Sequence, residues 1–398
     1  MKPRLLLIGL LVALIAAPSS NWSAESAIDF QRARQLMQKR QRGETLSADE
    51  QQYLQRAVGA RRTQQRESAG QPGGPGLQGR ERAIAGEKTG LVPLCDMSAS
   101  DRYKGEDGGL YGAGRNEPPT DHAAAARREL ARIQPLDAEG KPAPDGKIVL
   151  LSIGMSNTTQ EYSEFMRLAR REAALNPHLV IVDGAFGGQD VMAWAEGRPI
   201  PRANNATPWD LALKRLTEAG VTAQQVQVVW LKQAKMGPAS WGEFPAHARK
   251  LADGMATILN RAKDRYPNLR VAYLSSRIFA GHATTGLNPE PYSYESAFSV
   301  RWLIQEQIKG AAKLNYDAAK GAVKSPLLLW GPYLWTDGVA PRKSDGLVWK
   351  REDLASDGTH PSQSGQAKVA KMLVDFFKTN ALAKTWFGKG DAPQMSHD

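Results

Sequence analysis

Five short apolar runs, separated by longer stretches of helical periodicity, follow one another from residue 147 of this 398-residue sequence. Strands that are apolar along their whole length are typical of a parallel sheet covered on both faces. The alternation of such strands with helices predicts an α/β fold, a three-layer α/β/α sandwich around a five-stranded parallel sheet. The runs are KIVLLSI (147–153), HLVIVDGA (178–185), QVQVVWL (225–231), LRVAYLSS (269–276) and SPLLLWG (325–331).

A helix is expected after each run, and in a sheet of this kind ligands bind outside the carboxyl ends of the strands. The residues that directly follow each apolar run are therefore the candidate site residues. The expected helices span residues 159–175, 208–220, 247–265, 295–313 and about 364–379.

Ser156 follows the first run by three residues and directly precedes a helix. In that position its hydroxyl would point into the crevice and face the positive end of the helix dipole. The alternative is that Ser156 or Thr158 is only the N-cap of the helix, since Ser and Thr are favoured there.

Small and polar residues follow the next two runs. Gly187 and Gly188 follow the second run, where paired glycines allow close backbone approach and leave amides free to donate to an anion. Lys232 and Gln233 follow the third run, where their side chains could meet a substrate oxygen.

The stretch SDGTHPSQSG, which follows the fifth run, places Asp357 and His360 three residues apart on a short loop before the last helix. A serine nucleophile needs a base to take its proton, an acid to orient that base, and donors for the oxyanion. All of these parts occur at the carboxyl ends of strands in one predicted sheet. The alternative is that Asp357 caps the last helix and that His360 is a surface residue.

The order and spacing of these motifs resemble the SGNH (GDSL-type) hydrolases, with G-x-S after the first strand, Gly after the second and D-x-x-H-P before the last helix. Within that group, GAFGGQDVMAW (184–194) is similar to the Gly-Gly-x-x-x-x-x-Trp stretch of carbohydrate acetylesterases related to sialate O-acetylesterase. The resemblance covers about residues 147–380. It implies an SGNH-hydrolase-like fold with Ser156 as nucleophile, His360 as base and Asp357 as the orienting acid.

The resemblance also implies three kinds of oxyanion donor. These are the backbone amide of Ser156, the amide of Gly188 or Gly187, and a side chain from the family's third sequence block, which follows the third run. In this block the donor is either Gln233 or Lys232. The chain departs from the family in that third block, because LKQA (231–234) stands where G-x-N-D is usual. It departs again before the nucleophile, where Met replaces the usual Asp.

Two further stretches are candidates for substrate binding. The loop 275–296 is rich in aromatic, Gly and Pro residues, and loops of this length are often binding loops or lids. It contains Arg277, which could meet an anionic or hydroxylated group or form a structural ion pair, and Tyr292. Trp335 follows the fifth run, where aromatic faces often stack on sugar rings, although burial in the core is the alternative.

The N-terminal quarter differs in composition from the rest. Residues 1–90 hold 14 Lys and Arg against 8 Asp and Glu, which is more than half of the formal net charge of +11. Because the remaining residues are only weakly basic, nucleic-acid binding is not expected. The first residues combine a basic start with a 13-residue apolar run, which is typical of a secretory signal and shorter than a membrane span. In the second of two expected N-terminal helices, Ser47 and Glu50 have capping-box spacing.

The sequence therefore predicts six consecutive parts. They are a signal peptide (1–24), a basic helical hairpin (25–66), a Gly/Pro-rich linker (67–88), a Gly-rich N-terminal extension packing on the catalytic domain (89–146), an SGNH-type hydrolase domain (147–385) and a disordered tail (386–398).

The leading hypothesis is a secreted or periplasmic serine esterase that removes small acyl groups, acetyl in the first place, from a carbohydrate. Two alternatives are a lipid or thioester hydrolase of the same fold and a catalytically inactive carbohydrate-binding surface protein. No cofactor and no metal are expected, because the six histidines include no H-E-x-x-H or comparable spacing. The expected partner is a small-molecule or polysaccharide ester, with no integral membrane span after signal cleavage.

Overall fold

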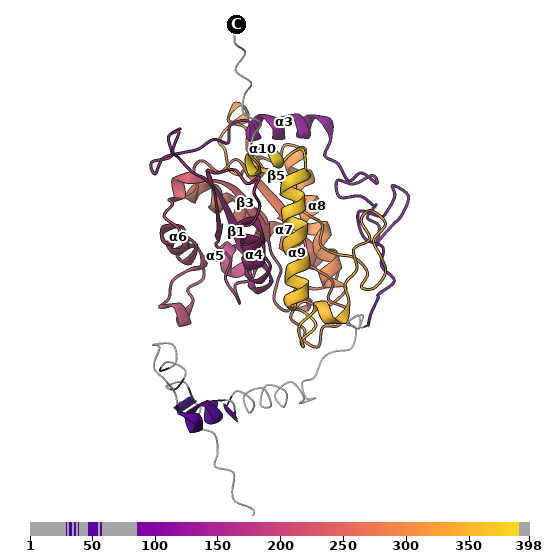
Figure 1. Cartoon of the computed structure of the whole chain (residues 1–398). Helices are drawn as coiled ribbons and strands as arrows, with labels where there is room; N and C mark the ends of the chain where they lie inside the picture. The colour runs from indigo at the N-terminus through magenta and orange to yellow at the C-terminus, as the bar shows by residue number, and fades with distance from the viewer. Residues whose placement is uncertain are drawn as a thin grey trace, which may run out of the picture. The chain divides into compact units, whose positions relative to one another are not determined.

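The computed structural model describes residues 86–389 continuously, together with residues 29, 32, 33, 36, 39, 47–54, 56 and 57 (Figure 1). The chain divides into two compact units, Met1–Arg80 and Glu81–Asp398, and each is described by itself. The predicted signal peptide lies outside the described residues, as does most of the predicted linker. None of the described helices is long and apolar enough to cross a membrane.

The described residues of the first unit form parts of two helices that contact each other. Leu36 and Leu54 are buried against one another, and Lys39 pairs with Glu50 at 3.1 Å. The capping box is confirmed, because the Ser47 hydroxyl accepts from the Glu50 amide and the Glu50 carboxylate accepts from the Ser47 amide.

The second unit is built on a five-stranded sheet in the order β2-β1-β3-β4-β5, and every pair of neighbouring strands is parallel. The predicted five-stranded parallel sheet is confirmed. Four strands are buried along their whole length, and only the edge strand β2 is partly exposed. The strands are β1 (Ile148–Gly154), β2 (Leu179–Asp183), β3 (Val226–Lys232), β4 (Val271–Ser275) and β5 (Leu327–Trp330).

Helices cover both faces of this sheet, which confirms the three-layer α/β/α sandwich. One face is covered by α4 (Ser156–Ala169) and α9 (Gln363–Thr379), which run side by side in Figure 1. The other face is covered by α5 (Val191–Glu196), α7 (Ala246–Arg265) and α8 (Tyr292–Ile308), with α6 (Pro208–Glu218) beside β2. Helix α3 (Thr120–Leu130) precedes β1, and helix α10 (Lys384–Phe387) follows α9.

The strand order places a topological switch point between β1 and β3. The chain leaves β1 through α4 on one face and leaves β3 toward α7 on the other, so the segments that follow β1 and β3 diverge. Ligands of open α/β sheets bind at such a point. Gln233 directly follows β3 and Ser156 lies two residues after β1, so both flank the switch point.

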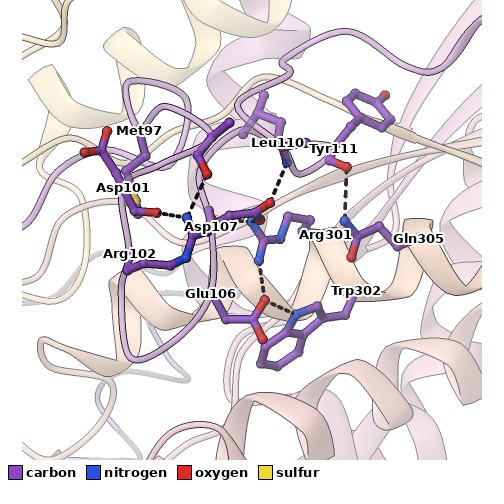
Figure 2. Close-up of polar contacts among 12 residues, drawn as sticks. Met97, Asp101, Arg102, Glu106, Asp107, Leu110, Tyr111, Arg301, Trp302 and Gln305 are labelled. Carbon is purple, nitrogen blue, oxygen red and sulfur yellow. Dashed lines mark hydrogen bonds and ion pairs between the residues drawn. The ribbon is translucent and has the colours of Figure 1, made fainter.

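The segment before β1 is fixed to α8 by a buried arginine (Figure 2). Arg301 donates to the backbone oxygen of Asp107 at 2.6 Å and to its carboxylate at 3.1 Å, and it also pairs with Glu106. The indole N–H of Trp302 donates to the same Glu106 carboxylate at 3.0 Å. These bonds hold residues 106 and 107 on the outer helical layer.

Three predicted boundaries need correction. The expected tail starts too early, because Trp386 and Phe387 are buried against Phe377 in the core. The predicted linker ends too late, since the Gly86 amide donates to the oxygen of Gly281 at 2.7 Å. The helix after β1 begins at Ser156 itself rather than at residue 159, which changes the surroundings of that serine.

Candidate active site

Ser156 is the first residue of α4, two residues after the end of β1. Its hydroxyl lies 2.7 Å from Nε2 of His360, which is 204 residues away in the sequence. As the first helical residue, Ser156 presents its backbone amide among the free N–H groups at the positive end of α4. Met155 occupies the N-cap position, so the alternative role of Ser156 as the cap does not hold.

His360 is in turn held by Asp357. The His360 Nδ1 lies 2.6 Å from a carboxylate oxygen of Asp357, and the other oxygen accepts the amides of Thr359 and His360 at 3.0 Å each. Burial alone would raise the pKa of Asp357, but the hydrogen bonds from His360 and Thr359 outweigh it and hold that pKa well below its usual range. Because a carboxylate can only accept a hydrogen bond, His360 Nδ1 carries the proton in the contact with Asp357. Nε2 then carries the lone pair that accepts the Ser156 hydroxyl proton.

The alternative reading of this loop, with Asp357 as helix cap, does not hold. The N-cap of α9 is Ser362, whose hydroxyl accepts from the Gly365 amide. Asp357 instead turns back onto its own loop. Ser156, predicted after the first run, is thus brought together with His360 and Asp357 of the loop before the last helix in one continuous hydrogen-bonded chain.

The loop after β2 approaches Ser156 closely enough to supply oxyanion donors. A Cβ on Gly187 would lie 3.8 Å from the Ser156 Cβ, so this loop packs directly against the serine. Gly188 has a φ of +79°, a left-handed conformation that favours glycine. Within residues 86–389, the amides of Gly187 and Gly188 donate to no protein acceptor. Both remain available to an oxyanion.

Gln233 is a further unsatisfied donor at the switch point. Its side chain is 1% exposed, and neither its amide nitrogen nor its amide oxygen has a hydrogen-bond partner among the described residues. An unpaired buried amide costs free energy. A substrate oxygen bound beside Ser156 would relieve that cost, which favours Gln233 as the side-chain donor of the third block.

Lys232, the alternative donor of the third block, points elsewhere. Its ammonium and both carboxylate oxygens of Glu161 are fully buried and form an ion pair. Burial lowers the pKa of Lys232 to about 8, although the Glu161 charge opposes the shift. Since its donors are turned to Glu161, the prediction of Lys232 as an oxyanion donor is corrected.

Two of the three predicted substrate contacts are also corrected. Arg277 is 1% exposed and donates to the backbone oxygen of Thr359 at 3.0 Å. Trp335 is fully buried and its indole N–H donates to Glu290 at 2.8 Å. Both side chains are turned to protein acceptors, so neither is retained as a substrate contact. Tyr292 begins α8 and packs edge-on against His247, so its role in binding stays a prediction.

Three residues near the serine were missed by sequence reasoning. Asn157 is buried and donates to the oxygen of Thr359 at 3.0 Å, and Glu161 lies on the buried face of α4. Arg202 donates to the oxygen of Gly187 and thereby fixes the peptide that carries the Gly188 amide. A signal was available for Glu161, because a carboxylate on the apolar face of an amphipathic helix needs a buried partner.

Comparison with known proteins gives matches to solved structures at low sequence identity. No protein-family model and no curated protein sequence matches the chain. A Bacteroides fragilis protein provisionally assigned as an acylhydrolase is 14% identical, with 68% of this chain and 100% of that chain covered and a TM-score of 0.33. A gut microbial diltiazem-metabolizing enzyme is 13% identical (60% and 48% covered, TM-score 0.30). The extracellular lipase of Streptomyces rimosus is 11% identical (57% and 99% covered, TM-score 0.27).

Proposed function

We propose that this protein is a serine esterase whose triad is Ser156, His360 and Asp357. The observation that carries the proposal is the hydrogen-bonded chain in which the Ser156 hydroxyl lies 2.7 Å from His360 Nε2 and His360 Nδ1 lies 2.6 Å from Asp357. Because these distances are ordinary hydrogen-bond lengths, the serine proton has a base within reach before substrate arrives.

In the proposed reaction, Ser156 Oγ attacks the ester carbonyl carbon while its proton passes to His360 Nε2. The oxyanion that forms accepts from the amides of Ser156 and of Gly188 or Gly187, and from Gln233. Collapse breaks the carbonyl carbon–alkoxy bond, and the alcohol leaves with the proton that His360 held. Water then attacks the acyl-enzyme by the same route and releases the carboxylic acid and free Ser156.

We propose that the substrate is a carbohydrate ester of a small acyl group, with acetyl as the leading candidate. We also propose that the protein is exported from the cytoplasm. The sequence stretch 184–194 supports the carbohydrate ester, and the basic and apolar first 24 residues support export. In the structure Trp194 of that stretch is buried and donates to the oxygen of Gly154 at 2.9 Å. It thereby fixes α5 on β1, so we assign it no contact with a sugar.

The test is a panel of nitrophenyl acetate, butyrate and palmitate and of acetylated polysaccharides, combined with fluorophosphonate labelling of the purified protein. We expect labelling at Ser156 and turnover of acetyl esters, with acetate released from at least one polysaccharide. A preference for palmitate would favour the lipid hydrolase. The absence of both labelling and turnover would reject the esterase and favour a binding protein. Cell fractionation and N-terminal sequencing of the mature chain test export.

A further inference from the structure

The loop that carries Asp357 and His360 is called the triad loop. One of its backbone oxygens accepts hydrogen bonds from two other elements of the site. The oxygen of Thr359, directly before His360, accepts the side-chain amide of Asn157 and the guanidinium of Arg277, each at 3.0 Å. Asn157 stands next to Ser156 in the first turn of α4, and Arg277 lies two residues past the end of β4. Both donors are buried, at 2% and 1% exposed.

The same peptide group is also fixed on its other side. The amide N–H of His360, which shares a peptide plane with the Thr359 oxygen, donates to the Asp357 carboxylate at 3.0 Å. Hydrogen bonds on both sides of a peptide polarise it and strengthen each other. With the peptide plane fixed, the Cα of His360 is fixed as well, and the imidazole has little freedom left.

Burying the Arg277 guanidinium costs free energy. Its Nε has no acceptor among the described residues, and burial lowers the pKa of the guanidinium. The charges of Glu161, Glu290 and Asp357 oppose that shift and offset part of the burial cost. An apolar side chain with the volume of Arg277 would stabilise the fold as well or better. The contact with the Thr359 oxygen is what an apolar side chain could not supply.

We infer that Arg277 and Asn157 are positioning residues, which set the His360 imidazole against the Ser156 hydroxyl by holding the oxygen of Thr359. The inference rests on the proposed serine esterase and assigns Arg277 a place in it that is distinct from substrate contact. Since a displacement of about 1 Å in a catalytic group can cost on the order of 10²-fold in rate, loss of this contact should lower kcat rather than raise KM.

The experiment measures kcat, KM and the rate of fluorophosphonate labelling for Arg277→Met, Arg277→Lys and Asn157→Ala in the full chain. Arg301→Met is the matched control, because Arg301 is equally buried, at 1% exposed, but binds Glu106 and Asp107 on the face of α8. We expect Arg277→Met to lower kcat and the labelling rate on the order of 10²-fold with KM nearly unchanged. Arg277→Lys, which restores a cationic donor, should recover part of that loss, and Arg301→Met should keep the wild-type kcat.

Asn157→Ala decides the question if Arg277→Met does not fold, since it removes one of the two donors and leaves no unpaired charge. We expect its kcat to fall about tenfold at constant KM, in line with one lost hydrogen bond of about 1.4 kcal/mol. Wild-type kcat in either Arg277→Met or Asn157→Ala overturns the inference, as does an equal fall in kcat for Arg301→Met. If the wild-type protein is labelled and active, such results leave the esterase proposal intact. If the wild-type protein is neither labelled nor active, the esterase proposal itself fails.

Discussion

Two arginines in the described chain keep only 1% of their surface exposed, and their surroundings differ. Arg301 binds the carboxylates of Glu106 and Asp107, which remain 28% and 34% exposed. Arg277 binds a backbone oxygen of the triad loop, and the carboxylates whose charges act on it are Glu161 and Glu290, which are fully buried, and Asp357, which is 33% exposed. The first arrangement holds a segment on the surface of α8, whereas the second lies mostly among buried charges and touches the site.

The difference shows that burial alone does not tell what a charged residue does. Around Arg301, water can replace a lost partner because the carboxylates reach solvent. Around the Lys232–Glu161 pair, which is fully buried, water has no such access, and each charge depends on another charged group. Substitutions around Arg301 should therefore lower stability moderately and leave activity unchanged. Substitutions around Arg277 and the Lys232–Glu161 pair should strongly lower either stability or activity.

The largest effect is expected at the nucleophile. Ser156→Ala should lower kcat on the order of 10⁵–10⁶-fold and abolish fluorophosphonate labelling, with little change in Tm. The double variant Ser156→Ala/His360→Ala should be scarcely slower, because triad residues act as a unit. Ester hydrolysis assays and thermal melts check both statements. Near-native turnover by Ser156→Ala would end the serine-esterase proposal.

The next effect is expected in the closed ion pair. Lys232→Met leaves the Glu161 carboxylate buried without a partner and should lower the free energy of unfolding by about 3–5 kcal/mol. Lys232→Met/Glu161→Leu removes both charges and should regain most of that loss. Urea denaturation of the three proteins measures it. A single variant as stable as wild type would show that water reaches the pair.

Gln233 should affect the rate and leave stability nearly unchanged. Gln233→Ala should lower kcat on the order of 10²–10³-fold with a much smaller change in KM, as expected for an oxyanion donor. Gln227→Ala is the control, because Gln227 is equally buried on β3 but its side chain bonds the backbone of Gln134. We expect that control to lower Tm and to keep kcat. The opposite pattern would remove Gln233 from the site.

A smaller effect is expected on the face of α8. Arg301→Met should lower the free energy of unfolding by about 1–3 kcal/mol, the cost of losing hydrogen bonds whose acceptors can be rehydrated. The loss should be less than that of Lys232→Met, and kcat should not change. Urea denaturation checks the ranking, and a reversed ranking would contradict the contrast between the two regions.

A last effect is a pH dependence of stability. Burial lowers the pKa of Lys232 to about 8, whereas an unfolded lysine titrates near 10.4. Between these values the unfolded chain binds more protons than the folded chain, so this lysine makes the free energy of unfolding rise with pH from about 8 to about 10.4. Urea denaturation at both ends of the window should show that rise in wild type relative to Lys232→Met/Glu161→Leu. Parallel pH dependence in the two proteins would contradict it.

Much of the fold was predictable because its signals are local. The five apolar runs match β1 to β5 to within about two residues at each end, since a strand buried on both faces must be apolar along its length. Helices α3 and α5 were missed, because α5 has only six residues and α3 is a polar, alanine-rich segment. Such segments take their conformation from what they pack against.

The sequence by itself determined the parallel strands and the short loop that joins Asp357 to His360, because both depend on residues close together in the chain. Only the tertiary structure decided the strand order, which puts Ser156 and Gln233 at one switch point. It also decided that Lys232 turns to Glu161, 71 residues away, and that Arg277 turns to Thr359, 82 residues away. A charged side chain at a strand end takes the direction in which its burial is best compensated, and the compensating partners come from elements that only folding brings together.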